Sequence, residues 1–360
     1  MKKNIGILCI ITFVFLATIV GTLYTENDGF PPAGKLYKAL TDLPFLSPYN
    51  LFNLVERSAL YGIIGVGVGF VIITGGIDLS IGSLIGLVAI TFPFVVVTKG
   101  MPLSVGLGAI LAVSLIAGLA HGLLITKLKL QPFVVTLCGL MIYRGIARWL
   151  VADKTMGYGA KSFEGLKLLV GKVSQLPGCA ELPGAKHVPV AFLIFIVLAI
   201  VAAVFLNKTI YGRYLLALGR NEQAARFSGI NTTLMIVVAY VICSLISGFG
   251  GLLFALDYGS IQPDSFGNFY ELYAIAAAVL GGCSLRGGEG SILGVALGAA
   301  LMRLLMNSIS MLGIDDQLEL AVIGTVILIG VIADEVVKRM AAKRRAILQA
   351  RQATAKAGPS

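Results

Sequence analysis

Ten continuous apolar runs constrain this chain more than any other feature. Most of them approach the roughly 20 residues that an α-helix needs to cross a hydrocarbon core about 30 Å thick. They do not alternate between apolar and polar residues, as the strands of a membrane β-barrel would. Only 13% of the chain is charged, which is about half the share usual for soluble domains. The sequence therefore predicts an all-α, polytopic membrane protein with about ten transmembrane helices. The runs cover residues 5–24, 58–74, 81–98, 104–126, 132–152, 189–206, 234–256, 271–285, 291–312 and 318–333.

The charges between the runs predict the orientation. If both termini are cytoplasmic (N-in/C-in), 16 of the 28 Lys and Arg residues fall on the inner side, as the positive-inside rule predicts. This topology places the loop 207–233 in the cytoplasm and the longer loop 153–187 in the periplasm. We expect a single transmembrane domain over 1–336 and a basic cytoplasmic tail over 337–360. Inner loops and a tail near anionic lipid headgroups explain the net charge of +10, so it does not indicate nucleic acid binding.

The stretch TGGIDLSIGS, residues 74–83, places glycines and polar side chains between two apolar runs. A Gly-Gly pair beside a carboxylate is typical of a broken helix, which a membrane tolerates only where protein or a water-lined cavity satisfies the backbone. We expect the next helix to begin near Leu79 or Ser80, with Asp78 as its N-cap. Two interpretations stay open: Asp78 only caps the helix, or the break also borders the path of the solute. The residues assigned to this break are Gly75, Gly76, Asp78, Ser80 and Ser83.

A second glycine-rich break lies at 280–294, with the sequence LGGCSLRGGEGSILG. Like the first, it places a Gly-Gly pair before a serine, and then a Gly-Ser pair at the expected start of the next helix. Both entering helices run from outside to inside in the ten-helix topology, so the similarity does not indicate an inverted repeat. The residues assigned to this break are Gly281, Gly282 and Ser284.

The polar loop 207–233 contains a short predicted helix. Asn221 is a favourable N-cap, the residues up to Phe227 favour helix, and Gly229 is a typical terminator. A short helix held on the cytosolic face between two spans suits the docking of another protein. By physical chemistry alone, a solvated connector is an equal alternative.

Together, these three stretches closely resemble motifs of the permease subunits of bacterial ABC importers for ribose-type monosaccharides. The resemblance runs from about Phe45 to Val336, and three spaced motifs in the same order make it specific. The first motif is matched by Gly75-Gly76-Ile77-Asp78-Leu79-Ser80-Ile81-Gly82-Ser83. The second is matched by Gly212-Arg213, Ala217, Gly219, Asn221, Ala224-Ala225 and Ser228-Gly229-Ile230. The third is matched by Ala274-Ile275-Ala276-Ala277, Leu280-Gly281-Gly282, Ser284, Gly287-Gly288 and Gly290-Ser291.

The resemblance implies a multi-pass protein of the bacterial inner membrane, with the ten-helix fold shared with vitamin-type importers. It implies that residues 221–230 form a coupling helix that docks on a cytosolic ABC ATPase. ATP and Mg²⁺ would bind that ATPase, so no cofactor is expected in this chain. It further implies a second permease copy or a homologue around a shared pathway, and a periplasmic binding protein that delivers the monosaccharide. The residues that it assigns to ATPase coupling are Gly212, Arg213, Gly219, Asn221, Glu222, Ala224, Ala225, Ser228, Gly229 and Ile230.

The chain departs from the family pattern at Tyr273, because members of the family usually have an acidic residue there, after the Glu-Leu pair. We expect this departure to bear on sugar or partner specificity. The loop 153–187 and the basic tail also look longer than is usual in the family, which bears on the subfamily.

Two polar pairs within the apolar runs have the i, i+4 spacing of one helix face. Arg148, beside Trp149, fits an interfacial cation that snorkels next to an aromatic anchor. Arg144 lies deeper, and it either snorkels too or pairs with a carboxylate or a helix end; it is included among the candidate pathway residues. Arg303 and Asn307 favour contact between helices over a sugar site.

No catalytic or metal site is expected. The stretch GFPPAGKL at 29–36 has the spacing of a P-loop, but Leu36 stands where Mg²⁺ needs Ser or Thr. His121 and His187 lie far apart in the sequence and have no evident carboxylate support. The chain is therefore predicted to be a transport subunit and not an enzyme. The alternative is an ion-coupled secondary sugar transporter, but only Asp78 supplies a carboxylate between spans at a plausible depth.

Overall fold

The computed structural model describes residues 2–27, 30–32, 35–159, 163–179, 181, 185–329, 332 and 340. The chain divides into two compact units, Met1–Gly313 and Ile314–Ser360. The described part of the second unit holds a 3-10 turn at Asp316–Leu318 and an apolar helix at Glu319–Ile329. The proposed tail at 337–360 lies outside the described residues, except for Met340.

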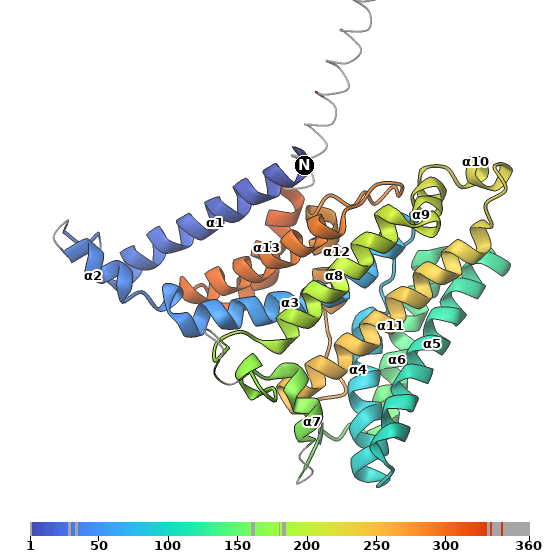
Figure 1. The fold of residues 1–360 in the computed structure, drawn as a ribbon, viewed down its shortest axis with the longest axis horizontal. Helices are drawn as coiled ribbons and strands as arrows, with labels where there is room; N and C mark the ends of the chain where they lie inside the picture. Colours follow the sequence, from blue (N-terminus) through green and yellow to red (C-terminus); the bar gives the residue numbers. More distant parts are fainter. Residues whose placement is uncertain are drawn as a thin grey trace, which may run out of the picture. The chain divides into compact units, whose positions relative to one another are not determined.

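The first unit is helical almost throughout (Figure 1). In its described part, two short strands, β1 (Met156–Gly157) and β2 (Ser260–Ile261), pair antiparallel with Met156 opposite Ile261. Its α-helices are α1 (Lys2–Glu26), α2 (Leu36–Thr41), α3 (Pro48–Ile73), α4 (Ile81–Pro93), α5 (Leu103–Lys127), α6 (Pro132–Val151), α7 (Glu164–Lys167), α8 (Val190–Lys208), α9 (Ile210–Arg220), α10 (Glu222–Phe227), α11 (Thr232–Tyr258), α12 (Tyr270–Leu280) and α13 (Ile292–Met311). Short 3-10 helices cover Pro44–Leu46, Leu168–Val170 and Val173–Gln175, and a π-helix at Phe94–Thr98 extends α4.

Each of the ten apolar runs forms a helix in the described residues. Within the part of the chain that the structure describes, eight helices are long and apolar enough to cross a membrane, and the shorter apolar helices α12 and Glu319–Ile329 cover the two remaining runs. The prediction of an all-α polytopic membrane protein is confirmed. Several short elements were not predicted, among them α2, α7 and the two strands. The longest is α9, an additional helix in the loop 207–233, formed because Gly212, Leu215 and Leu218 share its buried face.

Polar side chains fix where several of these helices begin. Ser47 accepts a hydrogen bond from the backbone N–H of Asn50 at the start of α3. Asn231 and Ser291 serve α11 and α13 in the same way. Such N-caps satisfy backbone donors that have no partner within the helix, so these boundaries are set by local sequence.

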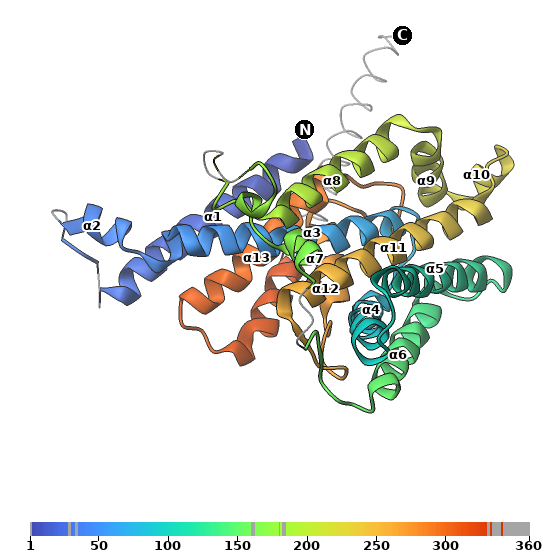
Figure 2. The same ribbon diagram turned by 60° about the horizontal axis from the view of Figure 1, so that its bottom comes forward.

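Burial separates inner helices from outer ones in the first unit. Over an 18-residue apolar stretch, 83% of the residues of α3 are buried, and 78% of those of α4 with its π-helical extension. The share is 22% for α1 and 28% each for α5, α6 and α8. Helix α3 packs on α8, α11, α12 and α13, while α4 packs on α5, α6 and α11; Figure 2 shows α4, α5 and α6 grouped beside α11. The outer helices expose large apolar side chains such as Ile116, Met141 and Val197, which is the exterior expected in lipid.

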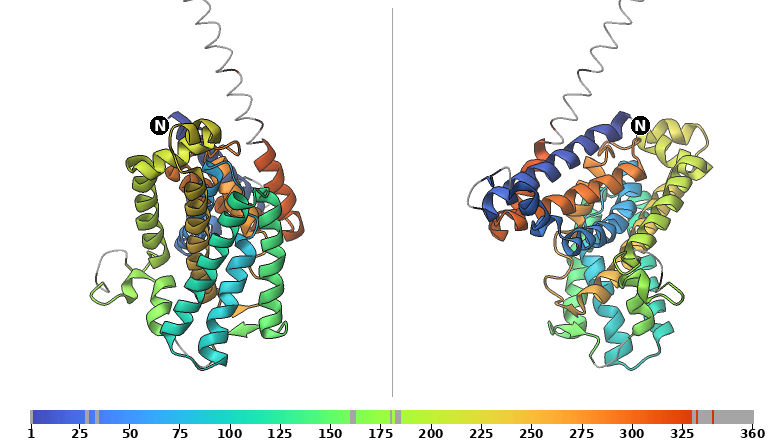
Figure 3. Two further views of the ribbon diagram at one scale, coloured as in Figure 1. Left: turned by 90° about the vertical axis from the view of Figure 1, so that its right-hand side faces the viewer. Right: turned by 60° about the vertical axis from the view of Figure 1, so that its left-hand side comes forward.

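The two ends of the first unit carry different segments. Helix α11 has 27 residues, which at about 1.5 Å per residue span roughly 40 Å. Helix α10 directly precedes α11, and strand β2 directly follows α11. Helix α10 and strand β2 therefore lie at opposite ends of the first unit. The start of α1 lies at the end that carries α9 and α10, and the strand pair lies at the other end (Figures 1 and 3).

Candidate functional site

The first glycine-rich break ends α3 at Ile73 and lets the chain turn before α4. Gly75 adopts a positive φ of 82°, in the left-handed region that favours glycine. The carbonyl of Ile77, in the non-helical stretch, accepts a hydrogen bond of 3.0 Å from the hydroxyl of Tyr240 on α11. A Cβ added to Gly76 would lie 2.8 Å from that hydroxyl. The break is therefore held by protein contacts, as a membrane-embedded interruption requires.

The second glycine-rich break packs directly on the first. The N–H of Gly288 donates a 2.8 Å hydrogen bond to the carbonyl of Ile73, which α3 leaves without a helical partner. Gly219, at the end of α9, lies against the same carbonyl and against Gly288, and a Cβ there would collide with both backbones. Gly287 approaches Gly75 in the same way. Three sequence motifs thus meet in one backbone-to-backbone contact, which we call the glycine junction (Gly75, Gly219, Gly287 and Gly288).

The remaining residues assigned to the second break shape its entry and exit. Gly282 has a positive φ of 88°, where α12 ends. Gly281 lies against the backbone of Gly294 at the start of α13, so α12 and α13 approach closely there. The N–H of Ser284 donates to the carbonyl of Glu289 over 3.0 Å, which closes the loop.

Asp78 does not cap α4, and that prediction is wrong by two residues. Helix α4 begins at Ile81, and its N-cap position is occupied by Ser80. The Asp78 carboxylate instead accepts hydrogen bonds through Oδ1 from the Ser80 N–H (2.9 Å) and the Ser80 hydroxyl (2.7 Å). Asp78 and Ser80 are fully buried, and Ser83 nearly so. The carboxylate therefore stabilises the turn before the helix rather than the first helical turn.

The short helix predicted in the loop 207–233 is present as α10. The side chain of Asn221 accepts a 2.9 Å hydrogen bond from the N–H of Ala224, as an N-cap does. Gly229 has a positive φ of 83°, and the N–H of Ile230 bonds back to the carbonyl of Ala225, a typical helix termination. The predicted N-cap and terminator are confirmed.

The two alanines of α10 face in different directions. Ala225 is only 4% exposed and packs inward, where α10 contacts α9 and α11. Ala224, Glu222 and Ser228 are exposed, and Phe227 is 90% exposed. The free face of α10 thus presents an apolar ring, which sequence reasoning treated only as part of the helix. A signal was available, because Phe227 stands among polar residues of the loop, where no core would need it.

Helix α9 carries the other residues assigned to this loop. The hydroxyl of Thr209 accepts a 3.1 Å hydrogen bond from the N–H of Gly212, which starts the helix. Gly212 is buried against backbone carbonyls at the end of α8, whereas Arg213 is exposed. Gly212 therefore allows the tight α8–α9 corner, and Arg213 remains free at the surface.

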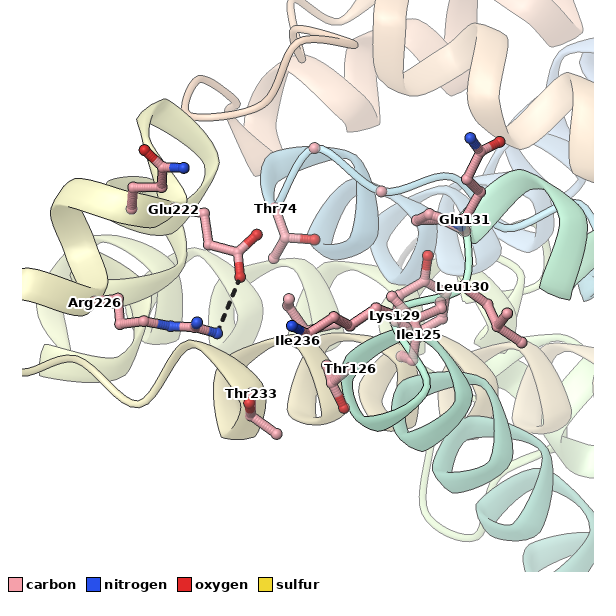
Figure 4. A pocket seen from close by; sticks show the side chains of 15 residues that line it. Thr74, Ile125, Thr126, Lys129, Leu130, Gln131, Glu222, Arg226, Thr233 and Ile236 are labelled. Atoms are coloured by element: carbon pink, nitrogen blue, oxygen red, sulfur yellow. Dashed lines mark ion pairs between the residues drawn. The ribbon is translucent and has the colours of Figure 1, made fainter.

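A cleft of about 510 Å³ opens beside the glycine junction. Its walls are the first break, the α5–α6 turn, α10 and the part of α11 that carries Thr233, Ile236 and Tyr240. Figure 4 shows the side chain of Lys129, from the α5–α6 turn, reaching toward Glu222 and Arg226 of α10. Glu222 and Arg226 pair loosely at 3.8 Å. The first break, the α5–α6 turn and the predicted cytoplasmic helix α10 are therefore neighbours around one space.

Arg144 does not reach this cleft. Its guanidinium donates hydrogen bonds to the carbonyls of Pro263 (3.1 Å) and Phe266 (2.7 Å) and to the side chain of Asn268 (2.7 Å). These three residues precede α12, near the β1–β2 end. Of the two interpretations left open, the structure supports pairing near a helix end over snorkelling.

The other polar residues of the spans have structural partners. Arg148 forms a two-point ion pair with Asp153 (2.7 and 2.8 Å) at the exposed end of α6, and this hydrogen bonding lowers the pKa of Asp153. Asn307 exchanges hydrogen bonds with Asn50 of α3 (2.7 and 3.1 Å), so it links helices as predicted. Arg303 does not join it and lies over the ring of Tyr61 instead.

Sequence reasoning missed a carboxylate partner for His121. Its Nδ1 lies 3.8 Å from Oδ2 of Asp78, so the statement that this histidine has no carboxylate support is wrong. The two residues are 43 positions apart, and only the packing of α4 against α5 brings them together. Among the described residues, no group of three or more His, Cys, Asp and Glu side chains could hold a metal ion.

Comparison with known proteins assigns the family. Residues 50–331 match the family described as branched-chain amino acid transport system / permease component. The ribose import permease of Bacillus subtilis is 38% identical over 297 residues, covering 81% of this chain and 86% of that protein. The ribose import permease of Escherichia coli K12 is 34% identical over 290 residues, covering 81% and 87%. The xylose transport system permease of Haemophilus influenzae is 31% identical over 345 residues, covering 83% and 92%. No solved structure matches the chain.

The matched region contains both glycine-rich breaks, α9, α10 and nine of the ten apolar helices. It coincides closely with the part of the chain that carries the three motifs. This chain therefore belongs to the permease family described as the branched-chain amino acid transport system permease component, and it is a multi-pass inner-membrane transport subunit rather than an enzyme.

Proposed function

We propose that this chain forms the membrane pathway of an ABC importer for a monosaccharide. Within the family, the relatives named for their substrates are import permeases for ribose, xylose and fructose, so a pentose or hexose is the substrate class. A periplasmic binding protein delivers the sugar at the β1–β2 end, where the loop 153–187 lies. A second copy of the chain, or a homologue, completes the pathway. ATP and Mg²⁺ bind a separate cytosolic ATPase.

One observation carries this proposal: α10 is held at the glycine junction with an apolar side chain facing outward. A solvated connector has no need of an aromatic ring that is 90% exposed. An ATPase groove that receives Phe227 would bury it, and aromatic side chains dominate such contacts. Gly219 lies in the last turn of α9, two residues before Asn221, the N-cap of α10. Because Gly219 contacts the backbones of Ile73 and Gly288, a movement of α10 would act on both breaks through this contact.

The proposed coupling residues then divide into two groups. The first group builds α10 and holds it in place: Gly212, Gly219, Asn221, Ala225, Gly229 and Ile230. The second group is exposed and available to the ATPase: Arg213, Glu222, Ala224 and Ser228, together with Phe227. The two breaks would move together with α10; their residues are Gly75, Gly76, Gly281, Gly282 and Ser284. Asp78, Ser80 and Ser83 are buried supports of the first break, and Arg144 supports the other end.

The test uses Phe227→Ala and Ala224→Glu in the full complex, reconstituted with its ATPase and binding protein. Removal of the exposed ring, or a charge beside it, should leave insertion unchanged but reduce ATPase co-purification and sugar-stimulated hydrolysis at least tenfold. Leu128→Ala is the matched control, since Leu128 is 63% exposed at the end of α5 near the same cleft and lies outside α9 and α10. Wild-type coupling in both α10 variants would contradict the docking role.

The same preparation separates this function from ion-coupled transport. An ABC importer loses uptake when ATP is depleted and keeps it in the presence of a protonophore. Uptake with the opposite sensitivities would show that the chain carries sugar by an ion gradient. Among the described residues, Asp78 and Glu271 are the buried carboxylates, at 0% and 8% exposed.

A further inference from the structure

A small pocket lies at the β1–β2 end of the first unit, where the chain passes from α11 to α12. Its volume is about 280 Å³, close to the roughly 300 Å³ of the smaller ligand pockets in proteins. None of the residues that line it is charged. We call this space the outer pocket. Its aromatic lining residues are Tyr258, Phe266 and Tyr270, and its polar ones are Ser260, Gln262 and Ser265.

The segment that forms the outer pocket reaches into the membrane domain. Arg144 donates to the carbonyl of Phe266 over 2.7 Å, and Arg144 stands seven residues before Val151, the last residue of α6. At about 1.5 Å per residue, this contact lies roughly 10 Å inside the end of α6. Helix α12, which follows the segment, has only 11 residues, so its length of about 16 Å is half of a hydrocarbon core about 30 Å thick. Non-helical backbone at such a depth is tolerated where it is buried in protein or lines a water-filled cavity.

Contacts with α4 and α6 hold this segment in place. Besides Phe266, Arg144 binds the carbonyl of Pro263 and the side chain of Asn268. Gly267 lies against the backbone at the start of α4, where a Cβ would collide with the carbonyl of Gly82. Interrupted helices with irregular backbone between them form the substrate sites of many secondary transporters. The outer pocket therefore has a fixed base at a depth suited to a transported solute.

The ring of Tyr270 is held by aromatic neighbours. Its centroid lies 5.1 Å from that of Tyr61 on α3 and 4.8 Å from that of Phe254 on α11. Tyr273, one turn further along α12, also faces Tyr61, at 5.9 Å. The aromatic surface thus continues inward from the pocket, and it includes the position where the chain departs from the family pattern.

The ring of Tyr258 is held in a different way. The guanidinium of Arg57 lies over it at 4.8 Å and forms a 2.6 Å ion pair with Asp257. Phe266 meets the same ring edge-on at 5.7 Å. Tyr258 nevertheless remains 49% exposed, so its ring is oriented by its neighbours and still accessible. Rings that are fixed in advance lose little conformational entropy when a ligand binds.

The polar side of the outer pocket offers hydrogen bonds to a ligand. The hydroxyl of Ser265 donates to Oε1 of Gln262 over 3.2 Å. This contact engages the oxygen of the Gln262 amide, whose nitrogen supplies two N–H donors. Ser260, on β2, is exposed beside them.

We propose that the outer pocket is a binding site for a neutral monosaccharide, where the sugar is held after its release from the binding protein. A sugar carries C–H groups on the faces of its ring, which contact aromatic rings favourably. Its hydroxyls lie around the edge, where Gln262 and the two serines can pair with them. An uncharged lining suits a free sugar better than a sugar phosphate, whose charge would be left without a partner. This inference rests on the proposed import of a monosaccharide, and it names the place in the chain that receives it.

Protection of a thiol in the pocket tests the site directly. The reporter is Ser260→Cys in a background that removes the accessible thiols through Cys9→Ala, Cys138→Ala and Cys179→Ser. The permease is reconstituted in nanodiscs with its ATPase, without nucleotide and without binding protein. At high millimolar concentration, at least one of D-ribose, D-xylose and D-fructose should slow alkylation by an impermeant maleimide several-fold, and D-ribose 5-phosphate should not. Thr155→Cys is the matched control, because Thr155 is exposed beside β1 but does not line the pocket, and its alkylation should be unaffected.

Two variants in the reporter background test the recognition chemistry. Tyr258→Ala removes an aromatic face, and Gln262→Leu removes the amide donors at similar volume. Each should raise the sugar concentration that gives half-maximal protection by about tenfold, which corresponds to 1.4 kcal/mol. Tyr258→Phe keeps the ring and should stay close to the parent reporter. If Tyr258→Ala does not insert, Gln262→Leu still decides.

Protection by none of the three sugars would overturn the proposal, as would half-maximal protection at the same concentration in the parent, Tyr258→Ala and Gln262→Leu. Weaker association of the binding protein in Tyr258→Ala, with unchanged protection, would show that the pocket contacts that protein instead, which also contradicts the proposal. Failure of the proposed function looks different. In that case the sugars still protect the reporter, but uptake by the full complex does not depend on ATP.

Discussion

At the residue scale, glycine has two different uses in this chain. Gly75 and Gly229 supply backbone with positive φ at turns. Gly219 has no such need, since it lies within α9; it is required because the backbones of Ile73 and Gly288 come too close for any side chain. In the sequence, the glycines of both kinds look alike, because each stands near a loop. Only the packing of three distant segments reveals that Gly219 is a contact between backbones.

Gly219→Ala therefore tests the glycine junction at its centre. A single methyl group would have to displace two backbone segments. We therefore expect the free energy of unfolding to fall by about 1–3 kcal/mol, the usual cost of overpacking. The measurement is the folded yield and the unfolding midpoint in detergent. Gly145→Ala is the control, because a Cβ at Gly145 of α6 meets nothing within 4 Å. Equal stability of both variants would show that the junction is loose.

At the element scale, α10 is too short to be stable by itself. A helix of six residues forms few internal hydrogen bonds and depends on its caps and its packing. Asn221, Gly229 and the inward-facing Ala225 supply these, and they orient Phe227 outward. The existence and limits of the helix could be predicted from local signals. The direction that each side chain faces could not, because it depends on α9 and α11.

Asn221→Ala should weaken α10 without disturbing the rest of the bundle. Loss of the cap costs about 1 kcal/mol, which at this short helix should lower ATPase association several-fold while insertion stays normal. Asn221→Asp keeps an oxygen acceptor and should retain association. Ala225→Glu is a different kind of change, since a charge at this buried position should impair folding itself. If Asn221→Ala and Asn221→Asp behave alike, capping of α10 does not limit docking.

At the scale of the whole molecule, the two ends of the first unit carry different segments. Helices α9 and α10 and the start of α1 occupy one end, and the described part of the loop 153–187 belongs to the other. The cleft lies at the first of these ends, because α10 lines it. This separation agrees with the N-in topology that the charges predict. It also places the proposed ATPase contact and the proposed entry of sugar on opposite sides.

Thiol labelling tests this orientation directly. Cys179 lies in the loop 153–187 with a partly exposed free thiol, so an impermeant maleimide should label it in intact spheroplasts. Cys179→Ser removes that signal, which corrects for the exposed Cys9 and Cys138 of the spans. In the Cys179→Ser background, a cysteine introduced by Ser228→Cys on α10 should react only after lysis. The reverse pattern would invert the topology.

The sequence by itself determined the membrane-spanning helices of this protein and the short helix α10. Long apolar runs leave helices as the stable way to cross a bilayer, loop charges orient them, and local caps define α10, since all of these depend on residues close together in the chain. The tertiary structure alone decided the rest: the meeting of Gly75, Gly219 and Gly288, the inward face of α10, and the approach of His121 to Asp78. These depend on how helices pack across long sequence separations, and a membrane-embedded glycine or histidine carries no local signal of its partner.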